Sequence, residues 1–425
     1  MFTRPYLKAA LVAIALPLAL GTSTTQTVAG FTMDGADAKA KPSRKPGIEA
    51  AFPRESYQQG AVARLVIYSK VARDVTVQVF RAGTEHVEMK PRDAMYGTAV
   101  TDLRHLGTVR RTQTIRVPIP DSPSGVYFAK LTGSGRRVGY APFILRPRQL
   151  GENRVAVVLP TLTWQAYNFR DDNGDGQEDT WYASPKVTSV LLGRPFEQRG
   201  VPPSYKYYDQ PFLRWLIANN KQVDYLAQSD VAGSNGRQLA DAYSLLIFSG
   251  HHEYVTEGEY DAVVGFRNRG GNLMFLSANN FYWRTVISGN RMAKAGKWRD
   301  VGRPEAALIG VQYIGNDEGE HRDGYHVRNA ESAPWLFAGT NLIDGSSFSS
   351  FGIEIDKKAS SSPPGTHVLA ELPNLLGPDM TGQMTYYEKG GAKVFAAGAF
   401  TLAGDVWLSP VDVMMRNLWN QLAQP

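Results

Sequence analysis

Hydrophobic and polar residues alternate with a period of two along the first third of the chain, from residue 47 to about residue 150. Such alternation is typical of strands that bury one face, and turn residues such as those at 120–125 separate the alternating segments. The pattern predicts a small antiparallel β-sandwich, immunoglobulin-like or similar, over residues 47–150. The expected strands are 62–68, 75–80, 114–118, 126–131 and 139–145.

The pattern changes after residue 150, where short continuous apolar runs alternate with amphipathic segments. Continuous apolar runs are typical of strands that are covered on both faces, and a period of 3.6 is typical of helices. Strands that alternate with helices predict a three-layer α/β domain with a largely parallel sheet over residues 151–425. The expected elements include strands at 154–160, 223–226, 245–249, 272–277 and 393–397 and a closing helix at 411–422 behind Pro410.

The N-terminus has the features of an export signal. Arg4 and Lys8 precede an apolar core at residues 9–20, and the small residues after it suit cleavage before Gly30. The core is too short to span a bilayer, so we expect a secreted protein, extracellular or periplasmic, with no membrane anchor once the signal peptide 1–29 is removed. Residues 30–46 are rich in Ala, Lys, Ser, Asp and Pro and predict a disordered linker.

Composition excludes several kinds of site and partner. The chain has no cysteine, which excludes disulfides, thiolate metal sites and a cysteine nucleophile. The net charge is +6, but no segment has the Lys and Arg density of a nucleic-acid-binding protein, so we expect no nucleic-acid partner. The sequence carries no signal for the oligomeric state.

The most informative segment is His251-His252-Glu253-Tyr254, which follows the apolar run at 245–249. The residues from Thr256 have the spacing of a helix capping box, so this turn joins a buried strand to a helix. In an open parallel sheet such turns lie at the carboxyl edge, where ligands bind. Two imidazoles and a carboxylate at this edge predict a chemical site rather than a packing feature.

Two further segments contain candidate site residues. The aromatic segment 163–168 follows the first strand of the α/β part, so Tyr167 can lie at the same edge, although on residue type alone a turn that caps the core is the better explanation. Glu388 lies between two short predicted strands and, on residue type alone, is better explained as a surface carboxylate. Ser249 lacks the Gly-x-Ser-x-Gly elbow of serine hydrolases, which argues against that chemistry.

The acidic loop 171–179 predicts a separate cation site. Its oxygen-bearing residues and Gly176 match the first six positions of a calcium-binding loop. The twelfth position is Tyr182 instead of glutamate, so a full EF-hand is not expected, and an acidic turn without Ca²⁺ is an equal alternative. The candidate calcium ligands are Asp171, Asn173, Asp175, Gln177 through its carbonyl, and Asp179.

Taken together, these segments resemble the C-terminal domain of the N,N-dimethylformamidase large (beta) subunit and its relatives, from about residue 123 to residue 422. The resemblance implies an α/β fold of the glutamine-amidotransferase or flavodoxin-like type without the cysteine nucleophile. It rests on the order and spacing of the segments 124–127, 163–168, 194–196, 214–216, 249–254, 271–284 and 387–398.

The resemblance also implies one iron ion, Fe³⁺, held by two tyrosines and one glutamate. Matched onto this chain, the ligands are Tyr167, Tyr182 and Glu253. His251 would lie beside them, and Glu388 would be the catalytic carboxylate. Phenolate and carboxylate oxygens are hard donors that suit a ferric ion, which can polarise an amide carbonyl or activate a water molecule.

The sequence therefore favours an exported, iron-dependent hydrolase of a carbon–nitrogen amide bond, with a small-molecule or peptide-like amide as substrate. The alternative is a non-catalytic extracellular protein, stabilised by calcium, that binds a glycan or cell-wall polymer. Metal content discriminates between them, because bound iron favours the enzyme and calcium alone favours the binding protein.

Overall fold

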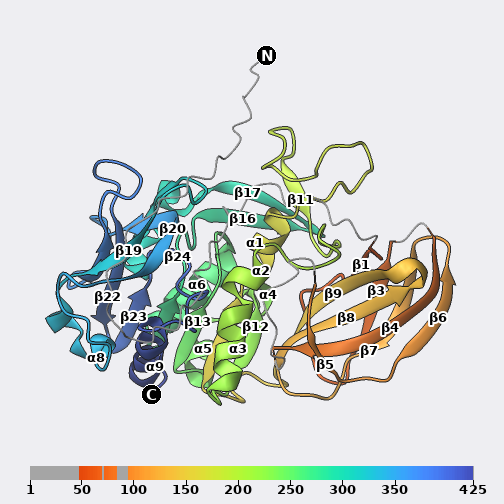
Figure 1. The fold of residues 1–425 in the computed structure, drawn as a ribbon, viewed down its shortest axis with the longest axis horizontal. Helices are drawn as coiled ribbons and strands as arrows, with labels where there is room; N and C mark the ends of the chain where they lie inside the picture. Colours follow the sequence, from red (N-terminus) through yellow and green to blue (C-terminus); the bar gives the residue numbers. More distant parts are fainter. Residues whose placement is uncertain (1–46, 69–70, 84–93, 425) are drawn as a thin grey trace, which may run out of the picture. The chain divides into compact units, whose positions relative to one another are not determined.

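The structure is a computed structural model that describes residues 47–68, 71–83 and 94–424 (Figure 1). The proposed signal peptide 1–29 and linker 30–46 lie outside the described residues. The described residues belong to one compact unit, Gly35–Pro425, which is rich in β-sheet and carries several helices. Among the described residues, no helix combines the length and the hydropathy that a membrane span requires.

Residues 50–145 form two sheets that pack face to face and appear in orange to yellow in Figure 1. The strands are β1 (Ala50–Ala51), β2 (Ser56–Tyr57), β3 (Val62–Ile67), β4 (Ala72–Ala82), β5 (Gly97–Ala99), β6 (Arg104–Val109), β7 (Gln113–Pro118), β8 (Gly125–Gly133) and β9 (Arg137–Leu145). The smaller sheet has the order β1-β3-β7 and the larger β2-β9-β8-β4-β5, with β6 also paired to β4. Leu65 and Val117 of the first share one core with Val77 and Phe143 of the second. The alternating sequence thus produces a β-sandwich.

From residue 155 onward, five strands form a parallel sheet. They are β10 (Val155–Leu159), β12 (Asp224–Ala227), β13 (Leu245–Phe248), β15 (Asn272–Phe275) and β23 (Ala392–Ala396). Their order is β12-β10-β13-β15-β23, and every neighbouring pair is parallel. These five strands match the five apolar runs in the sequence.

The same sheet continues beyond β23 with antiparallel strands, which the sequence did not lead us to expect. They are β18 (Gln312–Asn316), β19 (Arg322–Val327), β20 (Ser347–Lys357), β21 (His367–Leu372), β22 (Gly382–Lys389) and β24 (Ala399–Phe400). Loops without a helix join β21 to β22 and β22 to β23, which suits antiparallel pairing, and β19 and β20 also pair antiparallel. The prediction of a largely parallel sheet was therefore wrong for this half of the eleven-stranded sheet. The glutamine-amidotransferase or flavodoxin-like class stays a prediction.

Helices cover both faces of the parallel strands. Val157 of β10 packs with Phe212 and Leu418 on one face, and Val158 packs with Val231 and Val263 on the other. Burial on both faces explains why the apolar runs are continuous. The helices are α1 (Thr161–Ala166), α2 (Tyr205–Tyr208), α3 (Gln210–Ala218), α4 (Gln228–Ala232), α5 (Gly236–Ala242), α6 (Glu257–Arg267), α7 (Ala306–Ile309), α8 (Pro334–Phe337) and α9 (Val411–Leu422).

Local signals in the sequence set the starts of two helices. The hydroxyl of Thr256 accepts a hydrogen bond from the backbone N–H of Glu259 at 3.3 Å and caps α6. Pro410 directly precedes α9, whose bounds are those that the sequence predicted. Both expectations are confirmed.

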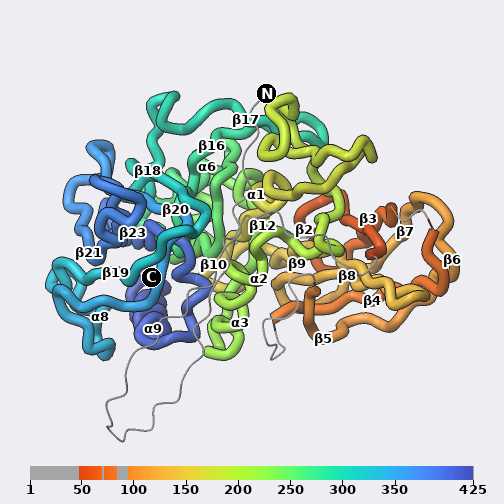
Figure 2. Tube along the Cα trace, turned by 45° about the horizontal axis from the view of Figure 1, so that its top comes forward, coloured from red at the N-terminus to blue at the C-terminus, as the bar shows by residue number. Residues whose placement is uncertain are grey.

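A second, smaller sheet adjoins the carboxyl edge of the parallel strands. Its strands are β11 (Ser189–Leu191), β14 (Tyr254–Thr256), β16 (Trp283–Ser288) and β17 (Arg291–Lys297), in the order β11-β17-β16-β14. Figures 1 and 2 show the hairpin of β16 and β17 beside β11, and β14 continues directly from the His-His-Glu turn.

The proposed boundary near residue 150 marks the change from the sandwich to the mixed sheet. Side chains from both sides of it nevertheless share one apolar cluster, for example Phe128 and Tyr140 with Trp164 and Tyr225. The boundary itself stays a prediction, because all these residues lie within one compact unit.

Candidate active site

The topology brings two predicted site segments to the same edge of the sheet. The turn at 251–253 follows β13, and Tyr167 ends α1, which follows β10. Because β10 and β13 are parallel neighbours, the chain leaves both strands at their shared carboxyl edge. The hydroxyl of Thr163 on α1 accepts the backbone N–H groups of Glu253 at 3.1 Å and Tyr254 at 3.4 Å, which fixes the turn against the helix.

Three oxygen atoms from distant parts of the sequence converge at this edge. The hydroxyls of Tyr167 and Tyr182 donate to the same Oε2 atom of Glu253, at 2.8 and 3.0 Å. The two phenol rings are stacked, with centroids 4.4 Å apart. Although 41% of Tyr182 is exposed, its hydroxyl lies between Glu253 and Tyr254. The structure therefore brings together all three residues that the resemblance implied as iron ligands.

Tyr254 joins this group, although no sequence pattern predicted a separate role for it. Its hydroxyl contacts the hydroxyl of Tyr182 and accepts a hydrogen bond from the indole N–H of Trp181 at 3.1 Å. Burial and the charge of Glu253 raise the pKa of Tyr254 well above its usual value. Tyr254 therefore helps to hold Tyr182 over the carboxylate.

The donor set fits a hard cation. The two phenol oxygens lie 2.8 and 3.0 Å from the Glu253 Oε2 atom. Two ligand atoms that bind one ion at right angles, each about 2 Å from it, have the same spacing. Burial, followed by the charge of Glu253, raises the pKa of both Tyr167 and Tyr182 well above its usual value, so without a cation both phenols keep their protons. Among the described residues, no group of three or more His, Cys, Asp or Glu side chains could hold a metal. The candidate centre thus depends on its tyrosines.

His251 lies between two buried carboxylates. Its Nε2 atom is 3.6 Å from Glu253 Oε2 and 3.7 Å from Glu354 Oε2, and it makes no hydrogen bond. Burial lowers the pKa of His251 to about 3, so the imidazole is neutral at neutral pH. The ring of Phe400 packs edge-on against it, with centroids 4.7 Å apart. The Nε2 atom thus faces both carboxylates without a hydrogen bond to either.

Glu354 is the site residue that sequence reasoning missed. It lies on β20, is 2% exposed, and accepts a hydrogen bond from Asn316 Nδ2 at 3.1 Å. The preceding residue, Ile353, has a φ of +70°, and the register of β20 against β24 shifts there. A β-bulge of this kind re-aims a side chain. In the sequence, the alternation Ile-Glu-Ile-Asp at 353–356 is typical of a strand with one solvated face, so it carries no signal for a buried carboxylate.

Glu388 lies at the opposite edge of the sheet. It is exposed on β22, accepts a hydrogen bond from Tyr386 at 2.6 Å, and pairs with Lys393 at the start of β23. The backbone N–H of Lys393 bonds to Asn272, which begins β15. Because β15 starts level with β13, this is the amino edge, whereas Glu253 follows the carboxyl end of β13. The structure therefore does not bring Glu388 to the site.

The acidic loop is closed by its own backbone. Oδ2 of Asp171 accepts the N–H of Gly176 at 2.9 Å, and these loop N–H groups lower the pKa of Asp171. The other side-chain oxygens also accept backbone N–H groups within the loop, so binding of Ca²⁺ stays a prediction. These bonds are Asp175 N to Asn173 at 2.8 Å, Gln177 N to Asp175 at 2.8 Å and Asp172 N to Asp179 at 2.7 Å.

A buried arginine ties this loop to α1. Arg194 is 1% exposed and donates to the carbonyls of Gln165 at 3.1 Å and Asn168 at 2.9 Å. It also forms an ion pair with Asp172 at 2.6 Å. The arginine thus holds the start of the segment that runs from Tyr167 to Tyr182.

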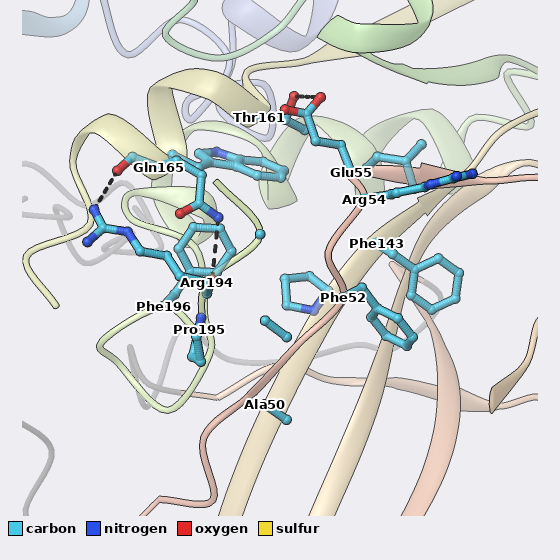
Figure 3. A pocket seen from close by; sticks show the side chains of 15 residues that line it. Ala50, Phe52, Arg54, Glu55, Phe143, Thr161, Gln165, Arg194, Pro195 and Phe196 are labelled. Carbon is cyan, nitrogen blue, oxygen red and sulfur yellow. Dashed lines mark hydrogen bonds between the residues drawn. The ribbon is translucent and has the colours of Figure 1, made fainter. Parts of the chain in front are cut away.

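Two pockets flank α1. A small recess opens beside Tyr167 and His251 and contains Asp209. A larger pocket lies between the sandwich and α1, with Phe143 and Phe196 among its walls (Figure 3). In Figure 3 the carboxylate of Glu55 meets the hydroxyl of Thr161, at 2.8 Å. Neither Tyr167 nor Tyr182 lines this larger pocket, whereas Tyr167 and His251 both line the smaller recess.

Comparisons with known proteins identify one family. The sequence profile described as N,N-dimethylformamidase beta subunit-like, C-terminal, matches residues 76–407. No curated protein matches the chain.

Solved structures give weak likenesses. An uncharacterized protein from Bacillus anthracis str. Ames is 13% identical with a TM-score of 0.17, and the match covers 23% of this chain and 80% of that one. A superoxide reductase (neelaredoxin) from Ignicoccus hospitalis is 13% identical with a TM-score of 0.14, over 24% and 80%. A carbohydrate acetylesterase from Xanthomonas citri is 9% identical with a TM-score of 0.17, over 84% and 97%. With TM-scores this low, none of them bears on the fold or the function.

Proposed function

Because the chain belongs to the N,N-dimethylformamidase beta subunit-like C-terminal family, we propose that it hydrolyses a carbon–nitrogen amide bond with the help of one iron ion. The observation that carries the proposal is the convergence of the Tyr167 and Tyr182 hydroxyls on one oxygen of Glu253. These three residues would hold ferric iron, which would supply Lewis acidity to polarise a carbonyl and to lower the pKa of water.

We assign the acid–base role to Glu354 instead of Glu388. Glu354 is buried at the same edge as Glu253, and its Oε2 atom faces the imidazole of His251. A carboxylate in this place takes a proton from the attacking water and returns it to the leaving nitrogen. Glu388 has no such access, because it lies at the amino edge.

His251 orients the reacting groups in this proposal. Its imidazole is neutral, and Nε2 faces the gap between Glu253 and Glu354. A neutral imidazole donates one hydrogen bond from Nε2, to the water or to the oxygen on which negative charge develops. The ring position is held by Phe400.

The features of residues 1–29 support export. The chain also lacks cysteine, and a protein without cysteine can pass between compartments of different redox state. We therefore propose a secreted amidase. Its substrate is a small-molecule or peptide-like amide, and the product amine is what an assay should detect.

The test is metal content together with amide turnover. Protein purified without chelators should hold one iron per chain, should be coloured by phenolate-to-iron charge transfer, and should release amine from an amide panel. Glu253→Ala should lose iron and turnover together, because it removes the oxygen that both phenols contact. If iron-loaded protein hydrolyses no amide, or if calcium alone is bound, the non-catalytic binding protein becomes the better explanation.

A further inference from the structure

Asp209 is a buried carboxyl group that the proposed reaction does not use. It directly precedes α3, is 1% exposed, and its Oδ2 atom accepts a hydrogen bond from the indole N–H of Trp164 at 3.2 Å. Its Oδ1 atom is buried and has no hydrogen-bond partner among the described residues. Buried polar atoms without partners are costly, so each one calls for an explanation. The residue Asp209 borders the recess beside Tyr167 and His251.

The backbone before His251 makes room for this carboxyl group. A Cβ atom on Gly250 would lie 2.4 Å from Asp209 Oδ1, closer than any real contact of that kind. Only glycine at this position allows the carboxyl to lie against the strand end that carries His251. The carboxyl oxygen therefore occupies a built position next to the candidate site.

The chemistry of the recess suits a positively charged group. Aromatic side chains form much of its wall: Trp164, Tyr167, Tyr208 and Phe400. Among the described residues, no lysine or arginine lines it. Aromatic faces attract ammonium groups, and a carboxylate completes such a site with a counter-charge.

Asp209 holds its proton more tightly than an ordinary carboxyl group does. Burial raises the pKa of Asp209 to about 8, since the surroundings offer the carboxylate one indole N–H and no cation. An ammonium ligand would supply the missing charge and stabilise the ionised form. Three anionic ligands would offset the charge of a ferric ion nearby, so the ion would not exclude a second cation.

We propose that this recess binds the ammonium group of an amine-bearing amide, with Oδ1 of Asp209 as the recognition atom. The inference rests on the proposed function, because it names the class of amide that the site would select. Small amides with a primary or methylated ammonium group next to the scissile bond, such as glycinamide, belong to this class. Asp209 and the aromatic wall determine specificity, while the reacting bond lies on the side of His251 and Glu253.

The first test measures binding without turnover. Propylammonium and 1-propanol have the same length and differ in charge, so their affinities can be compared by calorimetry or ligand-observed NMR. The intact protein should bind propylammonium at least tenfold more tightly than 1-propanol. Asp209→Asn should abolish that preference and leave 1-propanol within about twofold. Equal affinities, a preference for the alcohol, or an unchanged preference in Asp209→Asn would each overturn the proposal.

A second variant covers the case in which Asp209→Asn fails to fold. Phe400→Leu removes one aromatic face and leaves the carboxyl in place, so it should weaken propylammonium at least threefold and 1-propanol far less. Parallel loss of both ligands would contradict cation recognition. Thermal unfolding of each variant shows whether the fold is retained, and asparagine keeps an oxygen that accepts the Trp164 bond.

Turnover separates this inference from the proposed function. The kcat/KM for glycinamide should exceed that for propionamide, a neutral amide of equal size, at least tenfold, and Asp209→Asn should remove the difference. If propylammonium binds as expected but no amide is hydrolysed, the hydrolase proposal fails while the ammonium site stands. If amides are hydrolysed with no preference for charge, the ammonium site fails while the hydrolase stands.

Discussion

Glu354 and Glu388 both occupy strands of the same sheet, yet their side chains have opposite surroundings. Glu354 is buried, is held by Asn316 and faces His251. Glu388 is exposed and bonds to Tyr386. Because a catalytic carboxylate must reach the reacting atoms, these surroundings decide which of the two is the acid–base candidate.

Glutamine substitutions at these two positions form a matched pair. Glu354→Gln should keep its iron, because it is not a proposed ligand, and should lose about 10²-fold or more in kcat as a missing proton carrier. Glu388→Gln should keep both iron and kcat. The measurement is amine release by iron-loaded protein at equal metal content. Loss of activity in Glu388→Gln, with Glu354→Gln unaffected, would reverse the assignment.

The buried carboxyl of Asp209 predicts a pH-dependent stability. Its pKa rises from 3.8 to about 8 on folding because of burial, so the native state binds this proton more tightly than the unfolded state. The stability contributed by the proton is complete below pH 3.8 and is lost as the pH rises toward 8. Asp209→Asn cannot titrate, so its melting temperature should gain several degrees relative to the original protein between pH 4 and pH 8. A difference that is constant across this range would show that Asp209 is ionised in the fold.

At the scale of elements, the sequence predicted what depends on local patterns. The five parallel strands, the cap of α6 and the start of α9 each have a signal within a few residues. The antiparallel strands 312–389 have no such local signal, because their pairing depends on contacts between segments far apart in the chain. The same distinction holds for the site. The sequence predicted the turn at 251–254, whereas the position of the Glu354 side chain depends on a bulge at Ile353 for which the sequence has no pattern.

The segment between Tyr167 and Tyr182 depends on one buried arginine. Arg194 binds the carbonyls of Gln165 and Asn168 and the carboxylate of Asp172 with its forked guanidinium group. A lysine keeps the charge but cannot reach all three partners. The loop that carries Tyr182 to the site should therefore lose order in Arg194→Lys.

We expect Arg194→Lys to lower the melting temperature by several degrees and to reduce the iron content, even though it contacts no proposed ligand. Arg237→Lys is the control, because Arg237 is exposed and its ion pair with Asp241 is 3.8 Å long. Thermal unfolding and metal analysis of both variants make the comparison. Full iron content in Arg194→Lys would mean that Tyr182 reaches the site without this support.

At the scale of the whole molecule, the sandwich and the mixed sheet share an apolar core. Phe128 and Tyr140 of the sandwich belong to the same cluster as Trp164 and Tyr225. Polar contacts also join the sandwich to the mixed sheet. For example, the hydroxyl of Ser56 donates a hydrogen bond to the carboxylate of Asp230 at 2.7 Å. Separation of the two parts would expose apolar surface that the intact chain buries.

A shortened protein that begins at residue 151 should therefore be less stable than the full chain. We expect lower soluble yield and a melting temperature at least several degrees lower, because the cluster around Trp164 loses its partners from β8 and β9. Soluble expression and thermal unfolding measured side by side decide the question. An unchanged melting temperature would show that residues 151–425 are an independent domain.

The stacked rings of Tyr167 and Tyr182 have a consequence for a chain without cysteine. An ion held by both phenols would join two points about 15 residues apart, and a covalent link that closes a loop of this length restricts the unfolded chain by about 3 kcal/mol. Glu253 would close a second, longer loop. The proposed iron would thus act as a cross-link that needs no cysteine and that chelators would open. The supply of iron would then set the lifetime of this protein as well as its activity.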